Sequence, residues 1–279
     1  TLEHIIPYIE GKLFLKVNRE KSRVTRITSW ENFKFLGFAF RRYKGDVLIR
    51  VHPKSLKKAK YEDSVKISAE SKEEKGIYYS EYPQSLIDLL ERNPETEEFV
   101  LNYPFRDEAA LEVFSYDRSE GVPLMMQWDP RWGYQKYGSD VVGITGCGPV
   151  CLAMAGYYVT GDEGFSPDKM VEFASKNGYY SPGNGSSWTL ISEGGVKLGL
   201  DVTEIPLVKK RITDNLEVGN PIICAMGEGD FTTSGHYIVL VGLQDGLIRV
   251  NDPNSYANSE KLWSYEELEG QIRNLWVIR

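Results

Sequence analysis

Cys147 is the residue whose type and surroundings best suit nucleophilic chemistry in this chain. The 279 residues include only three cysteines and three histidines. Cys147 stands between two glycines and opens a run of small and apolar residues, with Pro149 close behind, which predicts a helix beginning here. The positive end of a helix dipole favours thiolate over thiol, and flanking glycines let a substrate approach the backbone closely.

A base for this thiol, and a group to orient the base, are expected from a β-hairpin. His236 opens one apolar run and Asp252 follows the next, with a Gln-Asp-Gly turn signal at 244–246 between them. The start of one strand and the end of its antiparallel partner lie side by side, so the imidazole and the carboxylate can meet. The carboxylate would orient the imidazole, which would pair with the thiolate. Asp252 precedes a proline, and a simple turn residue is the alternative interpretation.

Gln127 offers a fourth group for the same chemistry. Its side-chain amide, together with the backbone N–H of Cys147, can form an oxyanion hole. Cys151 and Cys224 lie inside apolar runs and are interpreted as small core residues. This chemistry requires neither a metal nor a cofactor, and the sequence predicts none.

The elements that must position these groups predict an α+β fold, because helices come first along the chain and an antiparallel sheet follows. Helices are expected over residues 83–93, 147–159, 166–177, 187–198 and 213–218. Ser264 and Glu267 form a capping-box pattern that predicts one more helix. Strands are expected over residues 98–103, 221–226, 236–243, 247–251 and 274–278. Residues 121–145 are expected to form a long structured loop of the kind that lines a site.

Charge divides the chain into parts. Residues 1–60 carry 15 basic and 5 acidic side chains, whereas the remainder carries 18 basic and 35 acidic ones. This sign change predicts a basic, β-rich segment over 1–60, a polar linker over 61–77 and a main domain over 78–279. Within the basic segment we expect strands at 12–17, 33–40 and 47–51, a hairpin turn at 44–46 and a helical turn at 55–60. We see no signal peptide and no apolar run long enough to span a membrane.

The candidate residues also carry a family resemblance. Gln127, the Gly-Cys-Gly-Pro turn at 146–149, Gly-His-Tyr at 235–237 and Asn-Asp-Pro at 251–253 together resemble the double-glycine (bacteriocin-leader) peptidase-like family of papain-fold cysteine peptidases, in particular its stand-alone bacterial branch. The likeness covers roughly residues 78–279. One departure is that more residues separate Gln127 from Cys147 than in the transporter-linked members.

The resemblance implies a papain-like fold and hydrolysis of a peptide bond in a peptide or protein substrate. It implies that Cys147 attacks the carbonyl and forms an acyl-enzyme, His236 moves the protons and Asp252 holds the imidazole tautomer. An amidase or transglutaminase-like reaction uses the same triad. A catalytically silent papain-like module that binds a peptide or a cell-wall component is a further alternative.

The basic front end has a resemblance of its own. Residues 17–22, 35–38 and 52–55 are similar to the C-terminal end of a group II intron reverse transcriptase. The Tyr-x-Asp-Asp motif of such polymerases is absent from the chain, so polymerisation is excluded. A basic segment of this kind is compatible with residual RNA binding, although a run such as 54–60 is more often a solvated surface.

Overall fold

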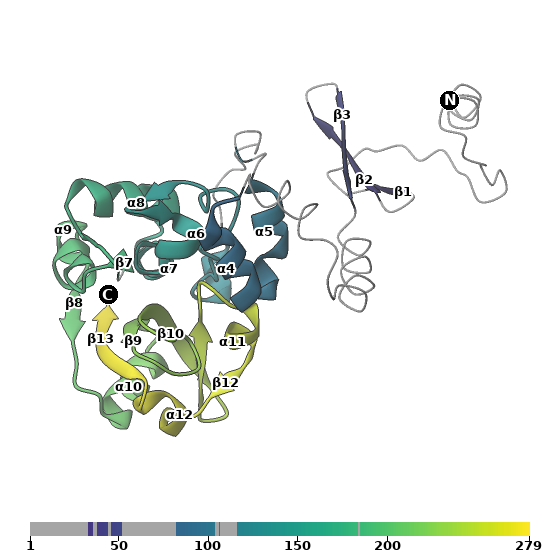
Figure 1. Cartoon of the computed structure of the whole chain (residues 1–279). Coiled ribbons are helices and arrows are strands. Elements are labelled where there is room, and N and C mark those ends of the chain that lie inside the picture. Colours follow the sequence, from purple (N-terminus) through teal and green to yellow (C-terminus); the bar gives the residue numbers. More distant parts are fainter. Residues whose placement is uncertain are drawn as a thin grey trace, which may run out of the picture. The chain divides into compact units, whose positions relative to one another are not determined.

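The computed structural model describes residues 82–103, 106, 116–183 and 185–279, together with the backbone of three short strands near the N-terminus. The chain divides into two compact units, Thr1–Glu74 and Lys75–Arg279, and each is described by itself (Figure 1).

The N-terminal unit contains a three-stranded antiparallel sheet. Its strands are β1 (Phe33–Phe35), β2 (Phe38–Tyr43) and β3 (Asp46–Val51), in that spatial order. Tyr43 lies opposite Asp46, which confirms the predicted hairpin. The strand predicted at 12–17, the helical turn at 55–60 and the linker at 61–77 lie outside the described residues.

The C-terminal unit is α+β, as the sequence predicts. Its sheet has six antiparallel strands in the order β12-β11-β10-β9-β13-β8. The strands are β8 (Val202–Glu204), β9 (Ile222–Met226), β10 (His236–Gln244), β11 (Leu247–Asn251), β12 (Leu262–Trp263) and β13 (Ile272–Ile278). Figure 1 shows the helices around α7 gathered in one half of the unit and the sheet in the other.

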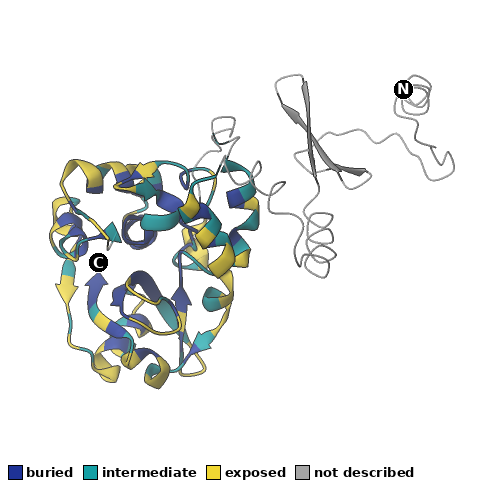
Figure 2. Ribbon diagram, in the orientation of Figure 1, coloured by how far each residue is buried: buried dark blue, intermediate teal, exposed yellow. Residues whose placement is uncertain are grey.

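Helix α7 (Cys147–Thr160) is the centre of the helical half. It is buried from Cys147 to Tyr157, because its residues are small or apolar on every face, and it packs against both α8 (Pro167–Lys176) and β10 (Figure 2). Gly161 ends the helix in the left-handed conformation, with a φ of 72°, which glycine adopts without a steric penalty. Gly156 lies against the ring of Phe165, where a Cβ atom would come within 2.2 Å.

The hairpin of β10 and β11 forms as predicted. Gln244 pairs with Leu247 across a two-residue turn in which Asp245 and Gly246 both have positive φ, 52° and 79°. Two positive φ values are typical of a type I′ turn, whose twist matches that of the flanking strands. The turn fixes the register of the pairs from Gln244 to Gly242. An irregularity between Leu240 and Gly242 then shifts the register, so that the last residue of β11, Asn251, lies opposite Val239 near the start of β10.

The first described part of the C-terminal unit is mostly helical. The predicted amphipathic helix is α4 (Gln84–Arg92), and a 3₁₀ turn, η1 (Pro94–Thr96), follows it. The strand predicted at 98–103 is wrong, because α5 (Glu97–Leu101) occupies this place. Phe99 and Val100 are both buried in a small apolar cluster with α4, so tertiary packing overrides the β preference of this sequence.

Several boundaries differ from those expected. The helix predicted over 187–198 is a π-helical turn (Leu190–Gly194) that continues into α9 (Gly195–Lys197), and the helix predicted at 213 begins earlier, as α10 (Lys209–Glu217). The loop 121–145 contains a small hairpin, β4 (Lys136–Tyr137) and β5 (Asp140–Val141), and the short α6 (Val142–Thr145).

The remaining elements are short. They are η3 (Arg118–Glu120), η4 (Glu163–Phe165), β6 (Tyr180–Ser181), β7 (Gly185–Ser186), α11 (Tyr256–Glu260) and α12 (Tyr265–Glu269). The capping box predicted at Ser264 and Glu267 begins α12. Within the part of the chain that the structure describes, none of the helices has the length and apolar character of a bilayer span.

Candidate active site

Cys147 is the first residue of α7 and lies at the wall of a pocket of about 550 Å³. Its residue exposure is 8%, and Gln127 and His236 line the same pocket. The glycines beside it serve packing as well as access. A Cβ on Gly148 would come within 2.7 Å of the Ser186 hydroxyl oxygen, and one on Gly146 within 2.4 Å of Val142. The lack of a side chain at both glycines therefore lets the start of α7 lie close to Val142 and Ser186.

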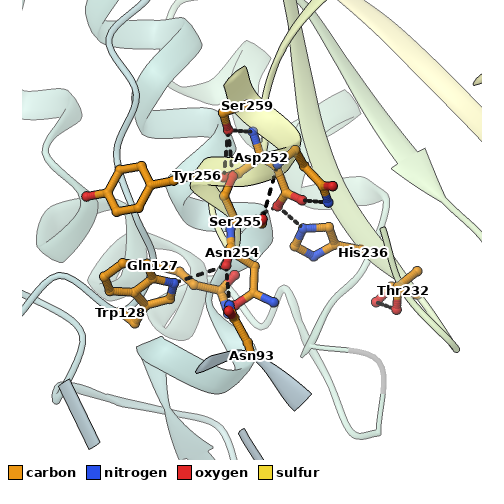
Figure 3. Close-up of polar contacts among 12 residues, drawn as sticks. Asn93, Gln127, Trp128, Thr232, His236, Asp252, Asn254, Ser255, Tyr256 and Ser259 are labelled. Carbon is orange, nitrogen blue, oxygen red and sulfur yellow. Dashed lines mark hydrogen bonds and ion pairs between the residues drawn. The ribbon is translucent and has the colours of Figure 1, made fainter. Parts of the chain in front are cut away.

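His236 and Asp252 meet as the hairpin predicts. His236 begins β10, and Asp252 directly follows the last residue of β11. The imidazole Nε2 lies 2.7 Å from Oδ1 of Asp252, and both side chains are buried, with exposures of 8% and 1% (Figure 3). Nε2 is thereby committed to the carboxylate, so Nδ1 is the ring nitrogen that can exchange a proton with another group.

The imidazole of His236 and the thiol of Cys147 line the same pocket. Burial by itself lowers the pKa of His236, but the charge and hydrogen bond of Asp252, followed by the contact with Cys147, raise this pKa to about 10. A protonated imidazole between a carboxylate and a thiol can stabilise a thiolate. The arrangement therefore suits nucleophilic attack by sulfur.

Asp252 is held by groups that the sequence did not point out. Its Oδ1 also accepts the backbone N–H of Asn254 at 2.9 Å, and its Oδ2 accepts Nδ2 of Asn258 at 2.8 Å. The backbone N–H of Asp252 donates to the hydroxyl of Ser259 at 2.9 Å. The signal that could have found them is the Asp-Pro-Asn-Ser stretch at 252–255, a pattern typical of an Asx-turn leading to a helix N-cap.

Gln127 lines the same pocket as Cys147 and His236. Its Nε2 donates to the carbonyl oxygen of Gly143 at 2.9 Å, and its backbone N–H donates to the carbonyl oxygen of Pro253 at 2.7 Å. The amide is 3% exposed, and its Oε1 has no hydrogen-bond partner among the described residues. Exchanging the two ends of the amide would set an oxygen against the Gly143 carbonyl, so the donor end faces Gly143.

The other two cysteines are fully buried and do not line this pocket. Burial raises the pKa of Cys151, one turn further along α7, and burial raises the pKa of Cys224 in β9 as well. Buried thiols with raised pKa values are inert. The structure thus brings Cys147, His236 and Gln127 to one pocket, with Asp252 behind the imidazole.

The main domain matches a known protein family. The model of the Peptidase_C39 like family matches residues 119–278. The chain belongs to the Peptidase_C39 like family. This confirms the predicted resemblance to the double-glycine peptidase-like proteins. The resemblance of residues 1–60 to a reverse transcriptase stays a prediction.

Two solved structures are similar to part of this chain. The peptidase domain of Streptococcus ComA, a bifunctional ABC transporter of a quorum-sensing pathway, has 20% identity over 48% of this chain and 89% of that one, with a TM-score of 0.38. A candidate C39-like peptidase from Bacillus anthracis has 13% identity over 57% of this chain and 94% of that one, with a TM-score of 0.37. No curated protein sequence matches the chain.

Proposed function

We propose that this member of the Peptidase_C39 like family is a cysteine peptidase that hydrolyses a peptide bond through Cys147, His236 and Asp252. The observation that carries the proposal is the buried imidazole of His236, which bonds Asp252 at 2.7 Å and lines the same pocket as Cys147. Family membership supports a peptidase function in general. The triad and the covalent step are the specific content of the proposal.

In the first half-reaction, the thiol proton of Cys147 passes to Nδ1 of His236, and the thiolate attacks the carbonyl carbon of the substrate. The resulting tetrahedral intermediate carries a negative oxygen. As this intermediate collapses, the carbon–nitrogen bond breaks, and His236 gives its proton to the leaving amine. The product is a thioester between Cys147 and the acyl part of the substrate.

In the second half-reaction, His236 takes a proton from a water molecule, which attacks the thioester carbon. The second tetrahedral intermediate then expels the sulfur, the carboxylic acid product leaves and Cys147 is regenerated. The role of Asp252 in both half-reactions is to accept Nε2–H and stabilise the imidazolium.

The negative oxygen of both intermediates requires donors. Cys147 is the first residue of a helix, and such residues have no intrahelical acceptor for their backbone N–H. The Gln127 amide has two hydrogens on Nε2, of which one points to Gly143. We propose that the other supplies the second donor of the oxyanion hole.

The test is hydrolysis of a peptide library, with products identified by mass spectrometry, in the wild type and in Cys147→Ala. We expect cleavage to be lost in Cys147→Ala and retained in the matched control Cys224→Ala, which removes a buried thiol from β9. Iodoacetamide should also modify Cys147 faster than a free model thiol.

Peptide binding without Cys147-dependent cleavage would favour the catalytically silent module instead. Labelling of Cys147 no faster than that of the model thiol would refute the activated nucleophile. Transfer of the acyl group to an added amine in place of water would point to the transglutaminase-like alternative.

A further inference from the structure

The helical segment 84–101 contacts the loop that carries Asp252, although it precedes the family match, which begins at residue 119. The Nδ2 of Asn93 donates to the carbonyl oxygen of Asn254 at 2.5 Å, and Figure 3 shows these two residues facing each other. Three wall residues of the catalytic pocket, Leu89, Arg92 and Asn93, come from the same segment. The segment is therefore both a wall of the pocket and a support for a neighbouring loop.

Glu95 makes the principal contact of this kind. Its Oε2 accepts the backbone N–H of Tyr256 at 2.7 Å, and its Oε1 accepts that of Ala257 at 3.0 Å. Tyr256 and Ala257 are the first two residues of α11, whose N–H groups have no intrahelical acceptor. A carboxylate at this end of a helix is also favoured by the helix dipole. Glu95 thus caps α11 from 161 residues away in the sequence.

Helix α11 in turn holds the catalytic carboxylate. Its residues Asn258 and Ser259 bond Oδ2 and the backbone N–H of Asp252, respectively. The N-cap residue Ser255 accepts the backbone N–H of Asn258 at 3.2 Å and lies 3.5 Å from Oε1 of Glu95. Glu95 is therefore connected to Asp252 through α11. Hydrogen bonds join Glu95 to the start of this helix, and further hydrogen bonds join residues of the same helix to Asp252.

We propose that Glu95 is a positioning residue of the peptidase, which fixes α11 and through it the carboxylate of Asp252 that orients His236. The segment 84–101 is then part of the catalytic unit, and the family-matched region needs it for full activity. This inference rests on the proposed function, since it assigns a role in the same reaction.

The test compares Glu95→Ala with Glu98→Ala in the full chain. Glu98 is exposed and lies three residues further on, and its side chain makes no hydrogen bond to α11 among the described residues, so its variant loses the same charge without the cap. A displacement of about 1 Å at a reacting group can cost roughly 100-fold in rate. We expect kcat of Glu95→Ala to fall by about tenfold or more with KM nearly unchanged, and Glu98→Ala to match the wild type.

A second readout separates positioning from general stability. The ring of His236 can be titrated by NMR, its signal being assigned by its loss in His236→Ala. We expect the titration of His236 to move towards acid in Glu95→Ala, because Asp252 shifts away, and to stay in place in Glu98→Ala. Glu95→Gln keeps an acceptor for one N–H group and should lie between the two, which decides the matter if Glu95→Ala does not fold.

An unchanged kcat together with an unchanged His236 titration in Glu95→Ala would overturn the inference. So would losses in kcat that are equal in Glu95→Ala and Glu98→Ala. If the wild type shows no Cys147-dependent cleavage, the proposed function fails, but the titration still reports whether Glu95 positions Asp252 against His236.

Discussion

Replacing Asp252 by asparagine removes the negative charge of the proposed triad carboxylate and keeps the shape of the side chain. The carboxylate accepts three donors, from His236, Asn254 and Asn258, at 2.7, 2.9 and 2.8 Å. An asparagine can keep its oxygen towards His236 and Asn254. Its amide nitrogen then faces Nδ2 of Asn258, and the amide of Asn258 can turn over to offer its oxygen. The variant thus preserves the hydrogen bond to the imidazole and removes the charge.

The expected effect follows from the loss of that charge. A hydrogen bond to a charged partner contributes about 1.5–3 kcal/mol, and one between neutral groups about 0.5–1.5 kcal/mol. The difference of roughly 1–1.5 kcal/mol corresponds to about one pH unit in the pKa of His236. Because the charge of Asp252 is the largest of the effects that raise this pKa to about 10, its removal must move the pKa towards acid.

The assay is the pH dependence of kcat/KM on a cleavable peptide. Deprotonation of the imidazolium ends the thiolate–imidazolium pair, so the alkaline limb of the profile should lie about one pH unit lower in Asp252→Asn than in the wild type. At neutral pH the loss in kcat should be modest, about tenfold or less. An alkaline limb in the same place in both proteins would refute the reasoning.

The free energy of unfolding should also change with pH as His236 titrates. The pKa of His236 is higher in the folded chain than its ordinary value of about 6.5, so the folded state holds the extra proton. The contribution to stability is fully present below about pH 6.5 and is lost as the pH rises through the folded-state pKa. Urea unfolding should show this alkaline loss in the wild type and a smaller loss in Asp252→Asn. Equal losses would contradict the assignment.

Three further substitutions test other parts of the site and the core. Gln127→Ala should lower kcat by roughly 100-fold with little change in KM, since it removes one oxyanion donor; a change confined to KM would refute that role. Asn258→Ala should lower kcat severalfold by loosening Asp252, and full activity would show that Asn254 suffices. Gly156→Ala should cost about 1–3 kcal/mol of unfolding free energy in thermal or urea denaturation, because its Cβ would meet the ring of Phe165 at 2.2 Å, and an unchanged midpoint would show that the ring yields freely.

Local signals in the sequence determined the main parts of the candidate active site. Cys147 begins α7 and His236 begins β10, as predicted, and the turn at 244–246 sets the hairpin that brings Asp252 to the imidazole. These predictions succeeded because helix starts and tight turns depend on residues close together in the chain.

Only the tertiary structure decided which elements and contacts surround and support these residues. It made residues 97–101 a helix, because burial of Phe99 and Val100 outweighed their β preference. It also set Gln127 against Gly143 and Glu95 against the start of α11. Such contacts join parts of the chain that are far apart, and their geometry depends on how whole elements pack. Periodicity and turn patterns depend on residues that are close together in the sequence, so they cannot predict these long-range contacts.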